Sequence, residues 1–431
     1  MILKILKNNT LLKVLSLNSV SMGISFLLGI ISTKIISVLL GSPGMVLLGS
    51  FRNFSSMIKS VATLGINNSL IKLFVENKND KKELSIIYAT FFWFFLFIST
   101  FLGIVVLLFA GFISEFLFFT NSFTNPIRFF GLFLPLMVIN TFWLAIYNGL
   151  EKFKRIVVIQ IVSNVLIFCF TAYLIWRDAI AGGLLAVALS EFLMVLVTFL
   201  FVLKDRKYFQ FDLQKVIDKK YLGVIKKFSI MALLSAVLIP LTLMLIRNFI
   251  VDTHSIQDAG IWDATNKLSG FYMMIFSSGL SLYYVPKLAS LKTDEEFKVE
   301  LKFYFKIFVP LFTLVLIIVF LFKGIILKIA FTDEFLKVQE VLIWQLLGDL
   351  LKIMTLAFGY QILVKARIKE YLILEIVFNL SYLFLSYYLI QILSFEGALK
   401  AYFYASLILF ILILFMFRKL FFDPRPSDIS R

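Results

Sequence analysis

Long apolar stretches alternate with short polar links about twelve times along this chain. The first six stretches lie near residues 14–40, 45–72, 85–110, 127–150, 156–176 and 180–203. The second six lie near residues 228–250, 259–285, 302–322, 340–364, 371–393 and 397–417. Each has room for the roughly 20 apolar residues that a helix needs to cross the hydrocarbon core of a membrane. The pattern therefore predicts an all-α polytopic membrane protein with about twelve transmembrane helices.

The two sets of six stretches resemble each other. Each set opens with two long stretches joined by a short turn and closes with a tight hairpin. Asn53 in GSFRNF aligns with Asn266 in WDATNK, and Asn164 aligns with Asn379. These similarities indicate an internal repeat.

An internal repeat predicts two six-helix bundles around a central cavity. We expect an N-terminal bundle over residues 1–205, a cytoplasmic linker over 206–227 and a C-terminal bundle over 228–431. Transporters built from repeats bind substrate between the halves and move one half against the other. The organisation therefore favours transport by alternating access.

Lys and Arg are concentrated on every second link. If the amino end is cytoplasmic, the cytoplasmic links and both termini hold 29 of the 42 Lys and Arg residues. The opposite links hold only Arg128, Arg177, Lys323, Lys328 and Lys337. This asymmetry is what the positive-inside rule describes for short loops. We therefore expect a multi-pass protein of a bacterial inner membrane with both termini in the cytoplasm.

The formal net charge of +16 is mostly a consequence of this topology. The cytoplasmic segments also carry 14 Asp and Glu residues, whereas the opposite links have a small negative net charge. No segment is long enough to fold as the soluble basic domain of a nucleic-acid-binding protein. We expect membrane lipids around the chain and no nucleic-acid partner.

Catalytic machinery is not evident in the sequence. A membrane glycosyltransferase or ligase would be expected to carry a sizeable extramembrane catalytic region, but the longest cytoplasmic link has about two dozen residues. His254 is the only histidine, so a His-based metal cluster cannot form. No G-x-x-x-x-G-K-[ST] phosphate-binding loop occurs. We therefore expect a protein that is not an enzyme and that has no cofactor or bound metal.

Twelve charged residues fall inside the predicted spans. The cations are Lys34, Arg52, Lys59, Lys72, Arg247, Lys267, Lys352 and Lys400, and the acids are Glu191, Asp263, Asp349 and Glu375. A charge at the membrane centre costs about 2.5–3.5 kcal/mol on insertion scales, so such side chains face protein or water, or extend to the interface. Lys72, Glu375 and Lys400 lie near span ends and are interpreted as interfacial. The other nine are candidates for function.

Helical spacing groups several of these candidates, because residues four and seven apart share one helix face. Arg52 and Lys59 form a cationic stripe that has no acid of its own. The stripe needs either an anionic ligand or an acid from elsewhere, such as Glu191. Asp263 and Lys267, four residues apart, can neutralise each other. Both alternatives remain open from the sequence.

Several segments resemble the Wzx-type flippases of O-antigen and enterobacterial common antigen synthesis, within the multidrug/oligosaccharidyl-lipid/polysaccharide superfamily. TKIISVLLGSPGMVLLGSFRNFSSMI (33–58) and GINNSLIKLFVE (65–76) resemble the first hairpin of that family. AGIWDATNKLSGFY (259–272) and YNGLEKFKR (147–155) resemble its eighth-span and fourth-loop segments. The chain departs from the family at Arg52, where a Gln is common.

The resemblance implies translocation of an undecaprenyl-diphosphate-linked oligosaccharide, of the O-antigen repeat-unit type used in lipopolysaccharide biosynthesis. It also implies a polysaccharide polymerase and a chain-length regulator as pathway partners. A cationic cavity would offset the charge of the diphosphate. The predicted substrate-binding residues are Lys34, Arg52, Asn53, Lys59, Arg247, Lys267 and Lys352. Arg52 and Lys59 are the favoured diphosphate contacts.

Membrane acids are the usual carriers of a coupling ion or proton. Glu191, Asp263 and Asp349 are therefore the candidates for ion coupling, although Asp263 and Asp349 can instead be held in ion pairs with Lys267 and Lys352. A multidrug or metabolite exporter of the same superfamily is the competing interpretation. The excess of cations inside the spans favours an anionic substrate, and a structural protein without transport would have little reason to retain them.

Overall fold

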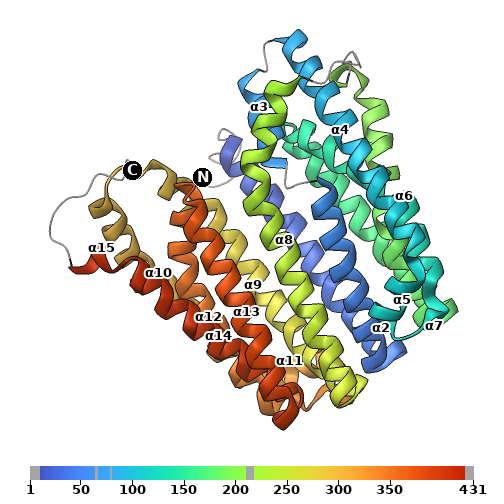
Figure 1. Ribbon diagram of the computed structural model, residues 1–431, viewed down its shortest axis with the longest axis vertical. Coiled ribbons are helices and arrows are strands. Elements are labelled where there is room, and N and C mark those ends of the chain that lie inside the picture. Colours follow the sequence, from blue (N-terminus) through green and yellow to red (C-terminus); the bar gives the residue numbers. More distant parts are fainter. Residues whose placement is uncertain (1–9, 64–66, 78–79, 210–217, 423–431) are drawn as a thin grey trace, which may run out of the picture. The chain divides into compact units, whose positions relative to one another are not determined.

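The computed structural model describes residues 10–63, 67–77, 80–209 and 218–422 (Figure 1). The regular elements of these residues are helices, as predicted. Ten of the described helices are long and apolar enough to cross a membrane. Two of them are double-length: α7 (Phe153–Lys204) contains two predicted spans, and α2 (Thr10–Thr63) contains the first span and most of the second. At 1.5 Å per residue each would be about 80 Å long, more than twice the thickness of the hydrocarbon core, so the prediction of about twelve spans is confirmed.

Both long helices are interrupted by a tight turn. The turn in α2 lies at Gly41, where φ is 61° and ψ is −158°. The turn in α7 lies at Asp178 and Ala179, and Ala179 also has a positive φ, of 48°. Glycine reaches a left-handed backbone conformation without steric cost, which explains the GSPG sequence at the first turn. Each long helix is therefore a hairpin of two arms.

Helix starts follow ordinary capping chemistry. The side chain of Asp80 accepts hydrogen bonds from the backbone N–H groups of Lys82 and Glu83 at the start of α4 (Lys81–Leu108). Thr293 and Glu296 form a reciprocal capping box at the start of α10 (Asp294–Leu321). Such caps satisfy backbone donors that have no partner within the helix. Local sequence thus fixes where these membrane helices begin.

The chain divides into two compact units. Unit 1 comprises Met1–Leu40 and Leu47–Leu241. Besides the arms of α2 and α7 it contains α3 (Asn67–Glu76), α4, α5 (Ala110–Phe118), α6 (Thr124–Gly149) and the first part of α8 (Lys219–Thr253). Helix α6 packs against α3, α4, α5 and α7. The approach of α4 to α6 is close, since a Cβ atom on Gly103 would lie 2.5 Å from the carbonyl oxygen of Gly131.

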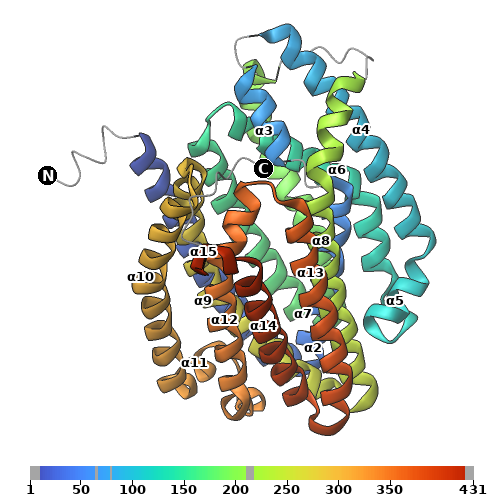
Figure 2. The same cartoon turned by 60° about the vertical axis from the view of Figure 1, so that its left-hand side comes forward.

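Unit 2 comprises Gly41–Val46 and Thr242–Arg431. Its helices after α8 are α9 (Ile256–Ser290), α10, α11 (Lys323–Ala330), α12 (Val338–Val364), α13 (Ile368–Leu393), α14 (Phe395–Met416) and α15 (Arg418–Phe422). Figure 2 shows α12, α13 and α14 side by side, and α14 packs against both of the others. Helix α9 packs against α12, and Trp262 of α9 is fully buried.

The tip of the α2 hairpin belongs to unit 2, although both arms continue into unit 1. The backbone N–H of Ser42 donates to Oε2 of Glu334 at 3.2 Å, and the Ser42 hydroxyl also bonds this carboxylate. Ser42 is fully buried, and a Cβ atom on Gly260 of α9 would lie 2.4 Å from the Ser42 Cβ. The tip is therefore an integral part of the packing of unit 2.

The closing hairpins of the two halves share one geometry. Ala179 in α7 and Ser394 between α13 and α14 both have a positive φ, of 48° and 52°. Three residues after each lies a glycine, Gly182 or Gly397, at which a Cβ atom would approach the carbonyl oxygen eight residues earlier to 1.9 Å or 2.3 Å. Each pair of equivalent residues is 215 positions apart. The same offset relates Asn164 to Asn379, which supports the internal repeat.

The structure differs from the sequence prediction in several links. The link at 109–128 contains α5, and the link at 323–337 contains α11. Within the second predicted span, 45–72, α2 is described to Thr63 and α3 from Asn67, and positions 64–66 lie outside the described residues. Of the predicted linker 206–227, positions 210–217 lie outside the described residues, and α8 already begins at Lys219. The units meet in sequence at Leu241 and Thr242, inside α8, whereas we placed the second bundle at 228.

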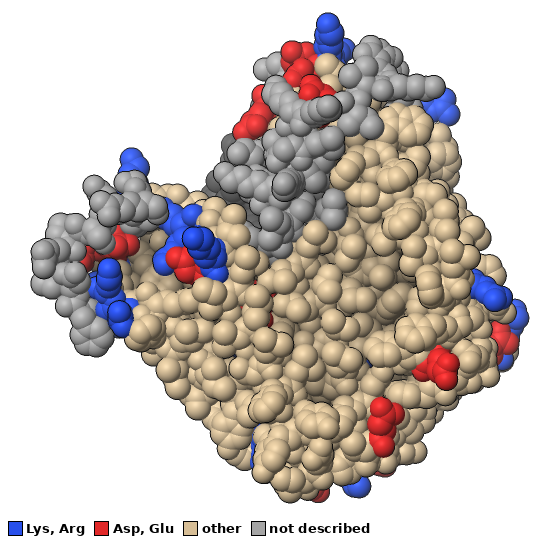
Figure 3. Space-filling view, viewed as in Figure 1, with Lys and Arg blue, Asp and Glu red and all other residues tan. Residues whose placement is uncertain are grey.

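The surface of the described residues is mainly apolar between the helix ends. On the face shown in Figure 3, Lys, Arg, Asp and Glu lie mainly near the helix ends, and the surface between them is mostly uncharged. Large apolar side chains are exposed among the described residues, including Phe384 at 78%, Leu108 at 76% and Trp176 at 74%. Such exposure is unfavourable in water but is what a helix facing lipid requires. The surface thus agrees with a membrane setting.

Candidate functional site

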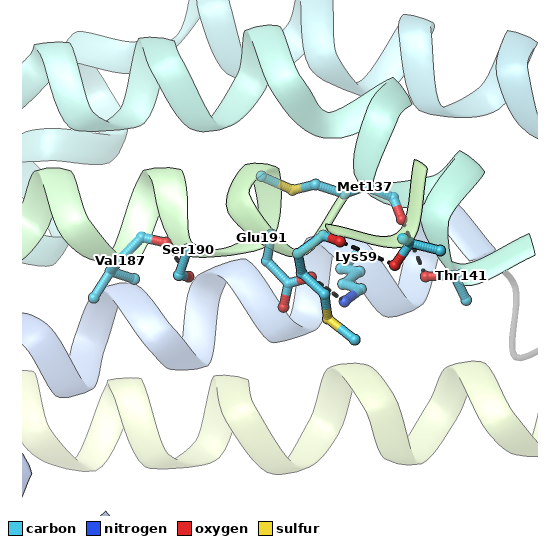
Figure 4. A network of polar contacts seen from close by, with 8 residues as sticks. Lys59, Met137, Thr141, Val187, Ser190 and Glu191 are labelled. Carbon is cyan, nitrogen blue, oxygen red and sulfur yellow. Dashed lines mark hydrogen bonds and ion pairs between the residues drawn. The ribbon is translucent and has the colours of Figure 1, made fainter. Parts of the chain in front are cut away.

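Lys59 in the second arm of α2 forms an ion pair with Glu191 in the second arm of α7. The Lys59 Nζ and Glu191 Oε2 atoms are 2.5 Å apart, and the side chains are 27% and 31% exposed. Figure 4 shows the two side chains pointing toward each other. The sequence left two ways to balance the charge of Lys59, an anionic ligand or an acid from another helix, and the structure contains the acid, Glu191. Because the pair is only half-buried, an anion can still reach the ammonium group.

Two hydroxyl groups lie near this pair in Figure 4, those of Thr141 on α6 and Ser190 on α7. The Thr141 hydroxyl donates to the carbonyl oxygen of Met137 at 3.1 Å, and the Ser190 hydroxyl donates to that of Val187 at 2.9 Å. Both hydroxyl oxygens can still accept a hydrogen bond. The surroundings of the pair are therefore polar.

Arg52 lies seven residues before Lys59 on the same arm, but its environment differs. It has no ion pair or hydrogen bond within the described part of the chain, and its side chain is exposed. Arg52 lines a pocket of about 180 Å³ in unit 1. The other lining residues are Ser25, Leu28, Gly29, Ser32, Asn164, Ile167, Phe168 and Thr171. Asn164 Nδ2 donates to Ser25 Oγ at 2.7 Å, which connects α7 to the first arm of α2 across this pocket.

Arg247 of α8 is held by Asp263 of α9 in unit 2. Its Nε and Nη2 atoms each donate to a different carboxylate oxygen at 2.7 Å, the bidentate geometry that gives Arg–carboxylate pairs their strength. The guanidinium carbon also lies 5.6 Å from the ring centre of Trp262. The two charged side chains are only 3% and 9% exposed. This pair is closed to ligands in the present conformation, so a substrate-binding role for Arg247 stays a prediction.

Asp349 of α12 is surrounded by hydroxyl groups. Its carboxylate accepts hydrogen bonds from Ser269 at 2.6 Å, from Tyr272 at 2.5 Å and from Tyr402 at 2.8 Å. The Gln345 amide also donates, at 3.3 Å. Asp349 is 1% exposed, so these neutral donors replace the water that the carboxylate would otherwise bind. The Asp349 cluster therefore joins α9, α12 and α14.

The remaining predicted residues are spread over both units. Lys34 and Asn53 are half-buried on the two arms of α2, and Lys267 is half-buried on α9. Lys352 on α12 is exposed, and no acid forms an ion pair with it in the described part of the chain. The sequence offered Lys352 as an ion-pair partner for Asp349, but hydroxyl groups occupy that role. The structure thus brings together Lys59 with Glu191 and Arg247 with Asp263.

Sequence reasoning missed the hydroxyl groups around Asp349. Ser269 and Tyr272 lie three residues apart and therefore share a face of α9, which was a detectable signal. Tyr402 carried no such signal, because it follows Asp349 by 53 residues and meets it only through tertiary packing. The Ser25–Asn164 bond, between residues 139 positions apart, was equally invisible.

Together, membrane-spanning helices in two units and partly accessible charges within the spans define a multi-pass membrane transport protein. The fold is that of known transporters. A multidrug resistance MATE family transporter of the MOP superfamily, in an inward-facing conformation, aligns with a TM-score of 0.75 at 13% identity, covering 93% of this chain and 96% of that chain. The lipid II flippase MurJ aligns with a TM-score of 0.72 at 14% identity, covering 93% of this chain and 87% of that chain.

The sequence comparisons identify the family. The model of the polysaccharide biosynthesis protein family matches residues 44–340, and this chain belongs to that family. The lipid III flippases of Escherichia coli (strain K12) and Shigella flexneri are each 25% identical to it over 376 residues. These alignments cover 87% of this chain and 90% of each relative. The resemblance inferred from the sequence is confirmed, and the chain is a multi-pass inner-membrane protein of the flippase class rather than an enzyme.

Proposed function

We propose that this chain translocates an undecaprenyl-diphosphate-linked oligosaccharide, of the O-antigen repeat-unit type, from the cytoplasmic to the periplasmic leaflet by alternating access. The observation that carries the proposal is its similarity to two lipid III flippases along 90% of their length. Membership of a polysaccharide biosynthesis family supports the same substrate class.

The charges in unit 1 suit such a substrate. An unpaired cation inside a membrane span costs about 2.5–3.5 kcal/mol, and an anionic headgroup offsets that cost each time it binds. Arg52 provides a charge with no partner of its own among the described residues. Lys59 can exchange Glu191 for a phosphate oxygen, because their pair is half-buried. We infer that Arg52 and Lys59 contact anionic groups of the substrate, with Lys59 at the diphosphate, and that Asn53 hydrogen-bonds the sugars.

The cations outside this stripe differ in how exposed their side chains are. Lys352 is exposed, Lys34 and Lys267 are half-buried, and Arg247 is enclosed with Asp263. We infer that the first three contribute to attraction of the headgroup. Arg247 joins them only in a conformation that opens its pair.

The three candidate coupling acids also differ. Asp263 and Asp349 are buried in closed polar clusters, whereas Glu191 is 31% exposed and bonded to a single lysine. A proton or ion can reach Glu191 with the smallest rearrangement, so we infer that Glu191 is the coupling acid. In the variant Glu191→Gln, whose side chain cannot ionise, ion-coupled transport should be lost and any remaining transport should not depend on pH. A pH profile of transport that matches the wild type would exclude this role.

Both termini are proposed to be cytoplasmic, on the basis of the charge asymmetry of the links. A C-terminal fusion to a reporter that is active only in the cytoplasm should be active, and a fusion to a periplasm-specific reporter should be inactive. The reverse result would invert the topology and with it the direction of transport. A polymerase and a chain-length regulator are the proposed partners, because they use the translocated unit.

Deletion of the gene provides the direct test of function. Surface polysaccharide of long chain length should be lost, and undecaprenyl-linked repeat units should accumulate, with masses that identify the sugars. An unchanged polysaccharide profile together with altered drug sensitivity would instead indicate the competing function, a multidrug or metabolite exporter of the same superfamily.

A further inference from the structure

The pocket around Arg52 has a mixed lining that a phosphate group does not require. Hydroxyl and amide groups line it, from Ser25, Ser32, Asn164 and Thr171. Apolar side chains line it as well, those of Leu28, Ile167 and Phe168. A sugar ring has the matching character, since its hydroxyl groups form hydrogen bonds at the edge while its C–H face packs on apolar or aromatic groups. A diphosphate has polar oxygens on every side and no apolar face.

The charge of the pocket also favours a sugar over a diphosphate. Arg52 is its only charged lining residue, and the remaining lining groups are neutral. One guanidinium matches one carboxylate in a bidentate fork. A diphosphate would be better served by several cations, such as those distributed along the rest of the spans. The pocket therefore fits a single negative charge carried on a sugar.

The size of the pocket sets a further limit. Its volume of about 180 Å³ corresponds to about six water molecules at roughly 30 Å³ each. That space holds one sugar residue and excludes an entire oligosaccharide. The Asn164–Ser25 hydrogen bond of 2.7 Å fixes the amide at the edge of the pocket, and its oxygen and remaining N–H are left to bind a ligand.

We propose that this pocket is a subsite for one acidic sugar residue of the transported oligosaccharide, with Arg52 binding the sugar carboxylate and Asn164 and Thr171 binding its hydroxyl groups. The assignment rests on the proposed flippase function and refines it, because it gives Arg52 a role in sugar selection in place of diphosphate binding. The diphosphate is then left to Lys59 and the other accessible cations.

Saturation-transfer NMR on the full-length protein in lipid nanodiscs tests the subsite, with free glucuronate, glucose and pyrophosphate as probes. Glucuronate should bind about tenfold or more tightly than glucose, and pyrophosphate should not displace it. Arg52→Ala should weaken glucuronate binding by about 10- to 100-fold, the range expected for loss of a charged hydrogen-bonded pair. Arg52→Lys, which keeps the charge and loses the fork, should give an intermediate value.

Asn164→Ala and a matched control complete the test. Asn164→Ala should weaken glucuronate binding several-fold. Arg177→Ala removes an exposed arginine that pairs with Asp178 at the α7 turn, away from the pocket lining, and should leave binding unchanged. Displacement by pyrophosphate, equal binding of glucose, or an unchanged Arg52→Ala variant would each overturn the proposal.

The flippase function and the acidic-sugar subsite can be refuted independently of each other. If glucuronate binds as expected but the wild-type gene does not restore polysaccharide in the deletion strain, the flippase function fails and the subsite stands. If polysaccharide is restored but glucuronate does not bind, the flippase function stands and the acidic-sugar subsite fails.

Discussion

Three acids inside the spans are neutralised in three physically different ways. Glu191 bonds a single lysine and remains half-exposed, whereas Asp263 is clasped by a bidentate arginine and almost fully buried. Asp349 has no cation within ion-pair distance among the described residues and relies on hydroxyl donors. Closed, fully hydrogen-bonded clusters hold a structure rigid, while a half-exposed pair can be opened at a smaller cost. We therefore expect Lys59 and Glu191 to act in transport, and Asp263 and Asp349 to stabilise the fold.

Lys59→Ala should reduce transport at least tenfold while the protein still reaches the membrane. The substitution removes a cation from the headgroup path and also leaves Glu191 without its partner, and the second effect alone is destabilising by about 1–3 kcal/mol. The double variant Lys59→Ala/Glu191→Ala removes the unpaired acid and should regain thermal stability. It should remain inactive, as measured by surface polysaccharide in the deletion strain, because it lacks both the Lys59 cation and the proposed coupling acid.

Lys59→Arg serves as the conservative comparison and should retain part of the activity, since it keeps the charge. If the double variant transported at the wild-type rate, Lys59 would serve only its ion pair. The assignment of a diphosphate contact to Lys59 would then be wrong.

Asp349→Ala should lower the free energy of unfolding by about 2–4 kcal/mol, because it leaves the buried hydroxyl groups of Ser269, Tyr272 and Tyr402 without their acceptor. Asp349→Asn keeps one acceptor oxygen and should have a smaller effect. Thermal unfolding in detergent measures both. Thr313→Ala is a suitable control, because that hydroxyl bonds only the Val309 carbonyl of its own helix. Equal stability of all three variants would show that the hydroxyl cluster contributes nothing to the fold.

The sequence was sufficient to identify which residues are charged inside the membrane, but not what they contact. Spacing of seven residues predicts one helix face for Arg52 and Lys59, and both lie on the second arm of α2. The partner of Lys59 lies 132 residues away, and the hydroxyl partners of Asp349 come from two other helices. Such pairings depend on tertiary packing, which leaves no periodic trace in a single sequence.

At the scale of elements, the two closing hairpins depend on the absence of a side chain at one position each. Gly182 and Gly397 lie against the carbonyl oxygens of Leu174 and Leu389, and each follows a residue of positive φ by three positions. Both halves of the chain use this same turn, so we regard it as a constraint on how adjacent arms can pack.

Gly182→Ala and Gly397→Ala should each greatly reduce the amount of folded protein. A methyl group at either position would approach a backbone carbonyl oxygen to 1.9 Å or 2.3 Å, and neither backbone can move without opening its hairpin. Gly359→Ala in α12 is the matched control, because nothing lies within 4 Å of a Cβ atom there. Fluorescence-detected size-exclusion profiles of tagged variants measure the folded fraction, and wild-type profiles for both hairpin variants would contradict the packing described above.

Apolar length predicted the membrane spans well, because the roughly 20 residues of a crossing stand out in any sequence. It did not predict α5 and α11, which have 9 and 8 residues and fall below that length. Nor could it show the geometry of the turns that interrupt α2 and α7. That geometry depends on the backbone angles of one or two residues, such as Ala179, which are fixed by the packing of the arms.

At the scale of the whole molecule, the two compact units do not follow the two halves of the sequence. The sequence suggested one boundary near residues 206–227, but the chain leaves unit 1 at Leu40, returns at Leu47 and leaves again after Leu241. Hydrophobic patterning cannot reveal that the α2 tip packs in unit 2. That packing depends on Glu334 and Gly260, which follow the tip by more than 200 residues.

Because the α2 tip, Gly41–Val46, belongs to unit 2, the N-terminal part of the chain supplies a segment to the packing of the C-terminal part. If the protein is produced as two separate polypeptides, divided between α7 and α8, the first piece still carries Gly41–Val46 and the second still carries the part of α8 that belongs to unit 1. Each piece therefore holds a segment that the other needs to complete its packing. The two pieces should co-purify from the membrane through a tag on either one, and Ser42→Trp, which cannot fit beside Gly260, should lower that recovery.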